Sequence, residues 1–265
     1  PATPFLAEVG KPPGPLRIAY STESPLGTPV HPECRRAVEE TLPLLEGMGH
    51  TVVEQRAPID GRAVADAYLV LYFGHVAADL RLIARTFGAA AAREVEPTTR
   101  LVGLIGESIS AAEFVESKRA WNTFARTMAA FHEQFDVYMT PTTASPPVPI
   151  GSLNPKPFEE LAVRALNVLR AGRALRASGI TDRLAVQNLA PVPFTQLANL
   201  TGQPAISLPL HWPSDGLPYG VQFMAPFGGE ATLIRLAAQL EEARPWSGRR
   251  PPVAASIRPE GATAG

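Results

Sequence analysis

Cysteine, lysine and long apolar runs are scarce in this sequence. The single cysteine, Cys34, cannot form an intrachain disulfide and has no CxxC partner for zinc, which is typical of a reducing compartment, so we expect a cytoplasmic protein. No apolar run approaches the roughly 20 residues that cross a bilayer, and the N-terminus lacks the regions of a signal peptide, so no membrane partner is expected. The three lysines, Lys11, Lys118 and Lys156, stand in no Ser-x-x-Lys arrangement. The sequence therefore offers no local Ser–Lys pair that would activate a hydroxyl.

Neither positive nor negative charge is in excess. The 24 basic residues meet 25 acidic ones, which gives a net charge of −1 and argues against a nucleic-acid partner. Apolar residues make up 45% of the 265 positions, enough for a well-buried globular core. The five histidines show no HxH or HExxH spacing, so we expect neither a metal nor a cofactor.

Three residues have side chains that could react, and a packing role is favoured for each of them. Ser108 lies in GESIS, which resembles a nucleophile elbow, but the fifth position is Ser instead of Gly and no strand precedes it. Cys34 lies near the N-terminus of a predicted helix, where a thiolate can be activated, but its spacing to Val38 and Leu45 favours packing. His132 lies on an apolar helix face and is expected to be a satisfied core histidine.

The chain is expected to be one α/β unit. Residues 1–15 carry five prolines and begin with Pro instead of Met, so we expect a linker from a missing N-terminal half. Residues 16–21 and 51–55 alternate like strands around a helix that begins at Pro32 and is kinked or shortened by Pro43. This is a βαβ-type unit. Residues 247–265 are rich in Pro, Gly, Ala and Arg and are expected to be a loose tail.

Helices and strands are also predicted for the rest of the chain. The clearest helix starts with a capping box at Ser110–Glu113 and carries an apolar stripe, which comprises Phe114, Trp121, Phe124, Met128, Phe131 and Phe135. A buried strand is predicted over 137–140 and helix over 157–178. Two adjacent strands, 205–210 and 219–224, are joined by a loop with the turn signal Asp215-Gly216. A helix over 229–243 follows.

Five segments, in order and in spacing, are similar to one protein family. Residues 194–209 read FTQLANLTGQPAISLP, and residues 215–223 read DGLPYGVQF. FDVYMTPTT lies at residues 135–143. RIA lies at the start of the range 17–50 and EGMGH at its end, and the match closes with Glu230-Ala231 and Pro245-Trp246. Over 16–246, this pattern resembles the C-terminal part of the amidase signature family. Among family members, the helical segments look closest to bacterial amidases of the 6-aminohexanoate-cyclic-dimer hydrolase type.

The resemblance implies a fold and an activity, and it implies that this chain does not contain the catalytic residues. The implied fold is the C-terminal half of the amidase signature fold, with a mixed β-sheet flanked by helices on both faces. The implied activity is hydrolysis of an amide bond in a small molecule by a serine, a second serine in a cis peptide and a lysine. In the family, these residues belong to a Gly/Ser-rich N-terminal half, and this chain has no such stretch. No catalytic residue is therefore assigned here, and the isolated chain is expected to be inactive, with the missing N-terminal catalytic half as its partner.

Four residues are candidates for lining the substrate path. In the tRNA-dependent amidotransferase subunits of the family, an aspartate that holds a substrate ammonium occupies the place of Val192, and Thr195 belongs to the same approach. Tyr72 lies on a helix with Tyr68 and His75, so that aromatic groups share one face. Asn199 would either cap local backbone groups or reach the active site. Core packing is the alternative for Val192 and for the Tyr72 helix.

Two other functions compete with a divided amidase. One is a non-catalytic binding or assembly module that keeps half of the fold. The other is an independent serine hydrolase that uses Ser108 and a histidine. The amide substrate and the oligomeric state, including a homo-oligomer, stay open at this point.

Overall fold

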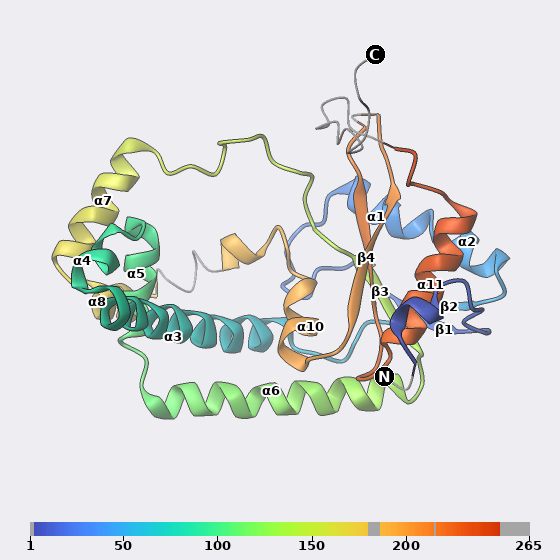
Figure 1. Cartoon of the computed structure of the whole chain (residues 1–265), viewed down its shortest axis with the longest axis horizontal. Helices are drawn as coiled ribbons and strands as arrows, with labels where there is room; N and C mark the ends of the chain where they lie inside the picture. The colour runs from blue at the N-terminus through green and yellow to red at the C-terminus, as the bar shows by residue number, and fades with distance from the viewer. Residues whose placement is uncertain (1–2, 180–185, 215, 250–265) are drawn as a thin grey trace, which may run out of the picture.

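The computed structural model describes residues 3–179, 186–214 and 216–249, and its centre is a mixed five-stranded sheet (Figure 1). The strand order is β2-β1-β3-β5-β4. β1 pairs in parallel with β2 and β3, whereas β5 is antiparallel to both β3 and β4. The parallel part comes from the βαβ unit that the sequence predicts. The strands are β1 (Arg17–Tyr20), β2 (Thr51–Glu54), β3 (Val137–Pro141), β4 (Ala205–His211) and β5 (Tyr219–Met224).

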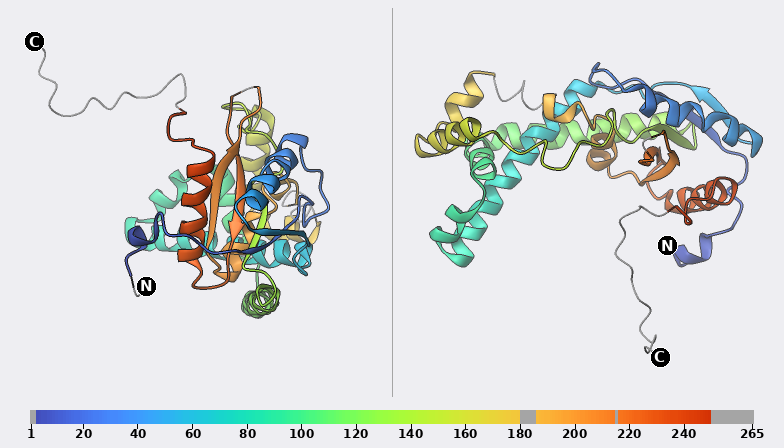
Figure 2. Two further views of the ribbon diagram at one scale, coloured as in Figure 1. Left: turned by 90° about the vertical axis from the view of Figure 1, so that its right-hand side faces the viewer. Right: turned by 90° about the horizontal axis from the view of Figure 1, so that it is seen from above.

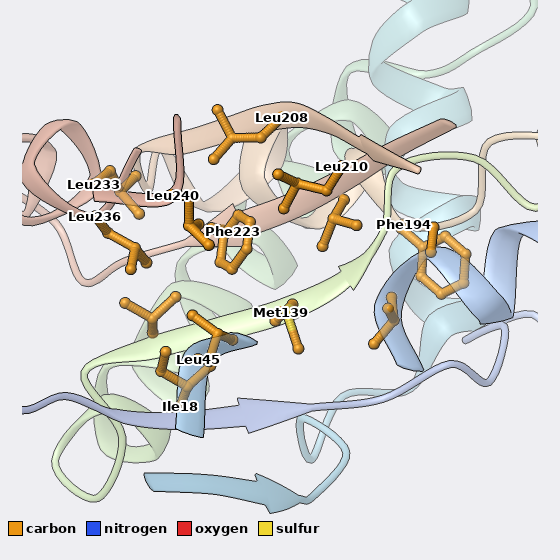
Figure 3. Close-up of a cluster of buried hydrophobic side chains, with 14 of the residues drawn as sticks. Ile18, Leu45, Met139, Phe194, Leu208, Leu210, Phe223, Leu233, Leu236 and Leu240 are labelled. Atoms are coloured by element: carbon orange, nitrogen blue, oxygen red, sulfur yellow. The ribbon is translucent and has the colours of Figure 1, made fainter. Parts of the chain in front are cut away.

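One face of the sheet is covered by α1 (Pro32–Glu39), α2 (Leu42–Gly47) and α11 (Glu230–Ala243). Apolar side chains recur at helical spacing in α11 and at every second position in the strands, so the two sets meet. The close-up in Figure 3 shows this layer: Leu233, Leu236 and Leu240 lie opposite sheet residues such as Phe223 and Ile18. Burial of this layer supplies most of the apolar core.

The opposite face is covered by α6 (Ala111–His132) and α10 (Thr195–Thr201). Met128 and Phe131 pack on Ala19 and Met224, which alternate along their strands with the residues of the first layer. The prediction of a mixed sheet with helices on both faces is confirmed. The break between α1 and α2, with Pro43 in the first turn of α2, also follows the prediction.

Beyond the sheet, the helices form an arm. It consists of α3 (Gly61–Phe87), α4 (Ala89–Glu94), α5 (Pro97–Gly106), α7 (Pro157–Val168) and α8 (Gly172–Ala177) (Figures 1 and 2). The capping box at Ser110 is present, and the predicted stripe of α6 divides between two partners. Its C-terminal part packs on the sheet, and its half-buried N-terminal part, Phe114, Trp121 and Phe124, packs on α3 and α10.

Two predicted segments lie partly outside the described residues. Asp215 of the turn signal lies outside them, although Gly216 has the positive φ of 75° that a turn glycine provides. Residues 250–265 of the predicted tail also lie outside. Arg249, in contrast, is described, and its guanidinium stacks on Trp212 at 4.2 Å.

The N-terminal segment is more ordered than a linker. Phe5–Glu8 form a 3-10 helix, η1, that packs against α11. Glu8 is buried and accepts hydrogen bonds from Arg235 of α11, Thr3 and Lys11. Composition alone predicts a linker, because it shows the prolines and glycines of the segment but not the contacts by which its one carboxylate holds the segment in place.

Loss of this carboxylate should destabilise the chain in a pH-dependent way. Hydrogen bonds from Thr3, Arg235 and Lys11 lower the pKa of Glu8 to about 2 from its usual 4.5. Because the folded-state pKa is depressed, the contribution of Glu8 is complete above about pH 4.5 and is lost as the pH falls towards 2. Glu8→Gln should therefore lower the urea midpoint at pH 7, and the difference from the native chain should shrink below pH 4.5.

The exposed pair Arg62–Asp66 provides the control for this measurement. Asp66→Asn should change the midpoint little at any pH, because exposed ion pairs contribute little to stability. An equal loss in Glu8→Gln at pH 7 and at pH 3 would show that Glu8 acts by packing alone.

The sequence predicts no apolar run long enough to cross a bilayer, and α3 differs from this prediction. Within the described chain, it is the one helix long and apolar enough to cross a membrane by length and composition, although charged residues such as Asp79 and Arg81 interrupt it. Only 17% of its most apolar stretch is buried, and it packs on α5, α6 and α10. Length and composition of one helix are weak evidence for a membrane, since core helices also satisfy them. α3 is therefore an apolar helix whose surface is only partly covered by the described residues.

The packing of α5 on α3 requires a glycine. A Cβ at Gly106 would lie 1.9 Å from the carbonyl oxygen of Phe73, which is backbone and cannot rotate away. We expect Gly106→Ala to lower the free energy of unfolding by about 3 kcal/mol, measured by urea denaturation. Gly47→Ala in α2 is the control, because a Cβ there meets nothing within 4 Å, and it should be neutral or slightly stabilising. Equal midpoints for the two variants would contradict the close approach.

Candidate functional site

A small cavity lies where the carboxyl ends of the parallel strands meet. Because β1, β2 and β3 run in parallel, the segments that follow them gather at one edge of the sheet, where ligand sites of open α/β sheets are usually found. Glu23 follows β1, Arg56 follows β2 and Thr140 is the last residue but one of β3, and all three line the cavity. Its volume is about 40 Å³, room for a few water molecules.

The cavity has apolar walls and a polar floor. Ile59, Val64 and Leu197 are among its apolar residues, and Tyr138 and Gln196 are among its polar ones. The mouth is neutral as a whole because Glu23 and Arg56 form an ion pair at 2.9 Å. Such a surface suits an uncharged group better than an ion.

Tyr138 is held in its neutral form. Burial raises the pKa of this phenol above its usual value of 10.0, although contacts with the Ala57 backbone and the Ser21 side chain oppose the shift. The ring packs edge-on against Phe131 of α6, with centroids 5.4 Å apart. Tyr138 can therefore orient a neighbouring group through a hydrogen bond, but it does not act as a base near pH 7.

A row of polar side chains continues from the cavity across the sheet. Gln222 of β5 donates to Thr140 Oγ1 and to the Phe194 carbonyl, both at 3.4 Å. Further along, the hydroxyls of Thr142 and Ser207 bond to each other at 2.6 Å. They meet above Gly220, where a Cβ would lie within 2.7 Å of both oxygens. Glycine at this position is what lets the two hydroxyls come together.

This row can bind but cannot by itself start a nucleophilic reaction. A serine nucleophile needs a base within hydrogen-bond reach, and the partner of Ser207 is another hydroxyl. Among residues 3–179, 186–214 and 216–249, no group of three His, Cys, Asp or Glu side chains is placed to hold a metal. The chemistry that these residues offer is orientation of an uncharged polar substrate.

None of the four predicted site residues lines the cavity, although Val192 and Thr195 are direct neighbours in the sequence of residues that do. Val192 and Thr195 are half-buried, and the Thr195 hydroxyl donates to the Val192 carbonyl at 3.4 Å. The residues between and after them, Phe194 and Leu197 for example, do line the cavity. Asn199 is exposed on α10 and is not among the residues that line the cavity.

Tyr72 lies on the α3 face that leads away from the cavity. Val64, Tyr68 and Tyr72 are spaced by four residues and therefore share one side of the helix, and Val64 lines the cavity. Tyr72 is 46% exposed and stacks on Tyr68 with a centroid distance of 6.0 Å and an interplanar angle of 5°. The predicted aromatic face thus exists and adjoins the cavity.

Sequence reasoning missed the polar members of the site. Tyr138 and Gln222 both lie inside family-like strands, and the sequence motifs predict only that they belong to strands. A signal was present in each strand, because a polar side chain alternates with buried neighbours such as Val137 or Phe223. Glu23 and Arg56 carried no such signal, since their pairing depends on the sheet.

Two of the reactive residues weighed in the sequence are structural. Ser108 follows helix α5, and its hydroxyl donates to the Ile105 carbonyl at 2.6 Å. Cys34 is buried in the core, and burial raises the pKa of its thiol, which is the opposite of activation. Both outcomes agree with the packing interpretation.

His132 departs from the prediction of a satisfied core histidine. Its Nδ1 lies 2.9 Å from the Phe135 carbonyl, which accepts a hydrogen bond, so Nδ1 carries the proton. Nε2 is buried and has no hydrogen-bond partner among the described residues. Burial lowers the pKa of this imidazole. The histidine is therefore neutral, and only one of its two ring nitrogens is hydrogen-bonded within the described residues.

Comparison with known proteins extends the similarity over nearly the whole chain. The family model described as Amidase matches residues 1–234. The chain belongs to the amidase signature family. It is 33% identical over 228 residues to Lipoamidase of Enterococcus faecalis, a match that covers 84% of this chain and 31% of that protein.

Solved structures of amidases share the fold. The structure of 6-aminohexanoate cyclic dimer hydrolase complexed with substrate matches with a TM-score of 0.76 and 26% identity, over 95% of this chain and 50% of that one. A bacterial aryl acylamidase of the amidase signature family matches with a TM-score of 0.66 and 17% identity, over 92% and 46% of the two chains. This chain therefore spans about a third to a half of the length of these relatives.

Proposed function

We propose that the protein hydrolyses amide bonds and that this chain supplies the half of the amidase fold that shapes the substrate path. The observation that carries the proposal is the family match over residues 1–234, together with a neutral, hydroxyl-lined sheet edge that offers no base of its own. The serine nucleophile, the second serine and the lysine come from the catalytic half, outside these 265 residues. This assignment rests on the sequence resemblance, which implies that these groups belong to a Gly/Ser-rich N-terminal half.

The geometry favours an uncharged substrate. The mouth of the cavity is internally neutralised by the pair Glu23–Arg56, and the approach beside it is apolar at Val192. A charged group placed there would lose its hydration without gaining a partner. An amide linking apolar or neutral polar parts, aliphatic, cyclic or aryl, meets complementary surfaces along the row from Tyr138 to Ser207.

The test uses a protein that contains both halves. Purified protein should turn over at least one uncharged member of a panel of aryl, aliphatic and cyclic amides. Tyr72→Leu should raise KM with little loss of kcat, because Tyr72 extends the cavity face of α3 away from the reacting atoms. Leu82→Ala, at an exposed position further along α3, should leave both parameters unchanged.

Two results would count against this proposal. A folded two-half protein that hydrolyses none of the panel would favour the non-catalytic binding or assembly module. Equal effects of Tyr72→Leu and Leu82→Ala would remove α3 from the substrate path.

A further inference from the structure

A second, larger cavity lies in the helical arm. Its volume is about 600 Å³, within the range of sites for small molecules. α3, α4, α5 and α7 form its walls, and Figure 1 shows these parts of the chain at the end of the arm that lies away from the strands. This cavity is therefore separate from the one at the sheet edge.

The lining of this arm cavity is strongly basic. Its charged residues are one glutamate, Glu107, and four arginines, which are Arg93, Arg100, Arg164 and Arg170. Arg164 pairs with Glu160 at 2.6 Å, and Glu107 lies between Arg81 at 3.4 Å and Arg170 at 3.5 Å. Within the part of the chain that the structure describes, Arg93 and Arg100 have no carboxylate at ion-pair distance. Two positive charges in one cavity are thus left without a counter-charge.

Arg100 provides the second observation. Its Nε is buried and has no acceptor among the described residues, whereas buried N–H groups of a charged side chain are nearly always hydrogen-bonded. Leaving such a donor unsatisfied is costly. A planar guanidinium matches the oxygens of a carboxylate or phosphate in two-point geometry. The unused donor and the unbalanced charge therefore call for the same kind of group.

We propose that the arm cavity binds a small oxyanion, a carboxylate or a phosphate, through Arg100 and Arg93. The guanidinium of Arg100 donates to one oxygen of the anion, and Arg93, which is exposed on α4, donates from another part of the cavity lining. Arg164 and Arg170 are already paired and add only a positive field. Glu107 does not compete for Arg100, because its carboxylate is occupied by Arg81 and Arg170.

Titration of the 265-residue chain with inorganic phosphate, and separately with acetate, tests the site at constant ionic strength. Nitrogen-15 NMR of the arginine Nε–H groups reports on Arg100 directly. Expected is a saturable shift of the Arg100 resonance with at least one of the two anions. Saturation by phosphate alone assigns a phosphate ligand, and saturation by acetate alone assigns a carboxylate.

Variants separate a built site from general attraction of anions. Arg93→Gln, at an exposed position where folding is not at risk, should weaken binding about tenfold, and Arg100→Lys should weaken it at least as much because the planar fork is lost. Arg126→Gln on α6 removes the same charge outside the cavity and should leave binding unchanged. Equal weakening by Arg126→Gln and Arg93→Gln, or a linear drift that chloride reproduces, would overturn the proposal.

Discussion

The 265-residue chain, incubated alone with aryl, aliphatic and cyclic amides, should release no product above background. Hydrolysis in this family depends on a serine activated by a lysine through a second serine, and removal of such a nucleophile leaves rates lower by several orders of magnitude. Product release followed by chromatography, with heat-denatured chain as blank, measures the difference. Addition of the catalytic half should restore turnover.

The described side chains explain the expected inactivity. Lys11 is engaged by Glu8 at 3.0 Å, and Lys156 precedes helix α7. The hydroxyl of Ser108 donates to a helix carbonyl, and that of Ser207 is bonded to Thr142. Neither of these two serine hydroxyls is paired with a lysine or a histidine in the way that nucleophilic catalysis requires.

Ser108→Ala is the decisive control for this prediction. If the purified chain hydrolyses an amide and Ser108→Ala abolishes that activity, the chain is an independent serine hydrolase and the divided-amidase proposal fails. Activity that survives in Ser108→Ala but co-purifies incompletely with the chain points to a contaminant and leaves the expected inactivity in place.

Local patterns predicted most of the sheet and its cover. The strands β4 and β5 were found from a short apolar run on each side of a turn signal, and α6 was found from the capping box at Ser110. Such signals act over a few residues, so they can be read without knowledge of the fold. Tyr72 was also placed on the correct helix face, because helical spacing alone brings it onto the side of Tyr68.

Pairings over long distances in the sequence were not predictable in this way. Glu8 meets Arg235 across 227 positions, and His211 meets Glu33 across 178. The divided stripe of α6 is another case: spacing identifies an apolar face but not which neighbour covers it. The buried Nε of Arg100 follows from the packing of helices, and a single arginine in the sequence of a helix gives no sign of it.

A single change at Val192 should redirect the preference of the two-half protein towards cationic substrates. Val192 is half-buried and next to the cavity-lining residue Pro193, and the sequence resemblance implies that it takes the place of an aspartate in the amidotransferase subunits of the family. A substrate ammonium that reaches this apolar position pays a desolvation cost of several kcal/mol without a partner. Val192→Asp supplies the opposite charge, so we expect the ratio of kcat/KM for a cationic amide to that for a neutral amide of similar size to rise on the order of tenfold to a hundredfold.

Val192→Thr distinguishes charge from polarity and shape in this experiment. Thr has nearly the volume of Val and no charge, so its ratio should stay close to that of the native protein. Arg56 is a basic residue that lines the cavity and would compete for the new carboxylate, but it is already paired with Glu23 at 2.9 Å. High salt should reduce the gain only in part, because a half-buried pair is less screened than an exposed one. If folded, active Val192→Asp shows an unchanged ratio, Val192 lies outside the substrate path and serves only to pack the approach to α10.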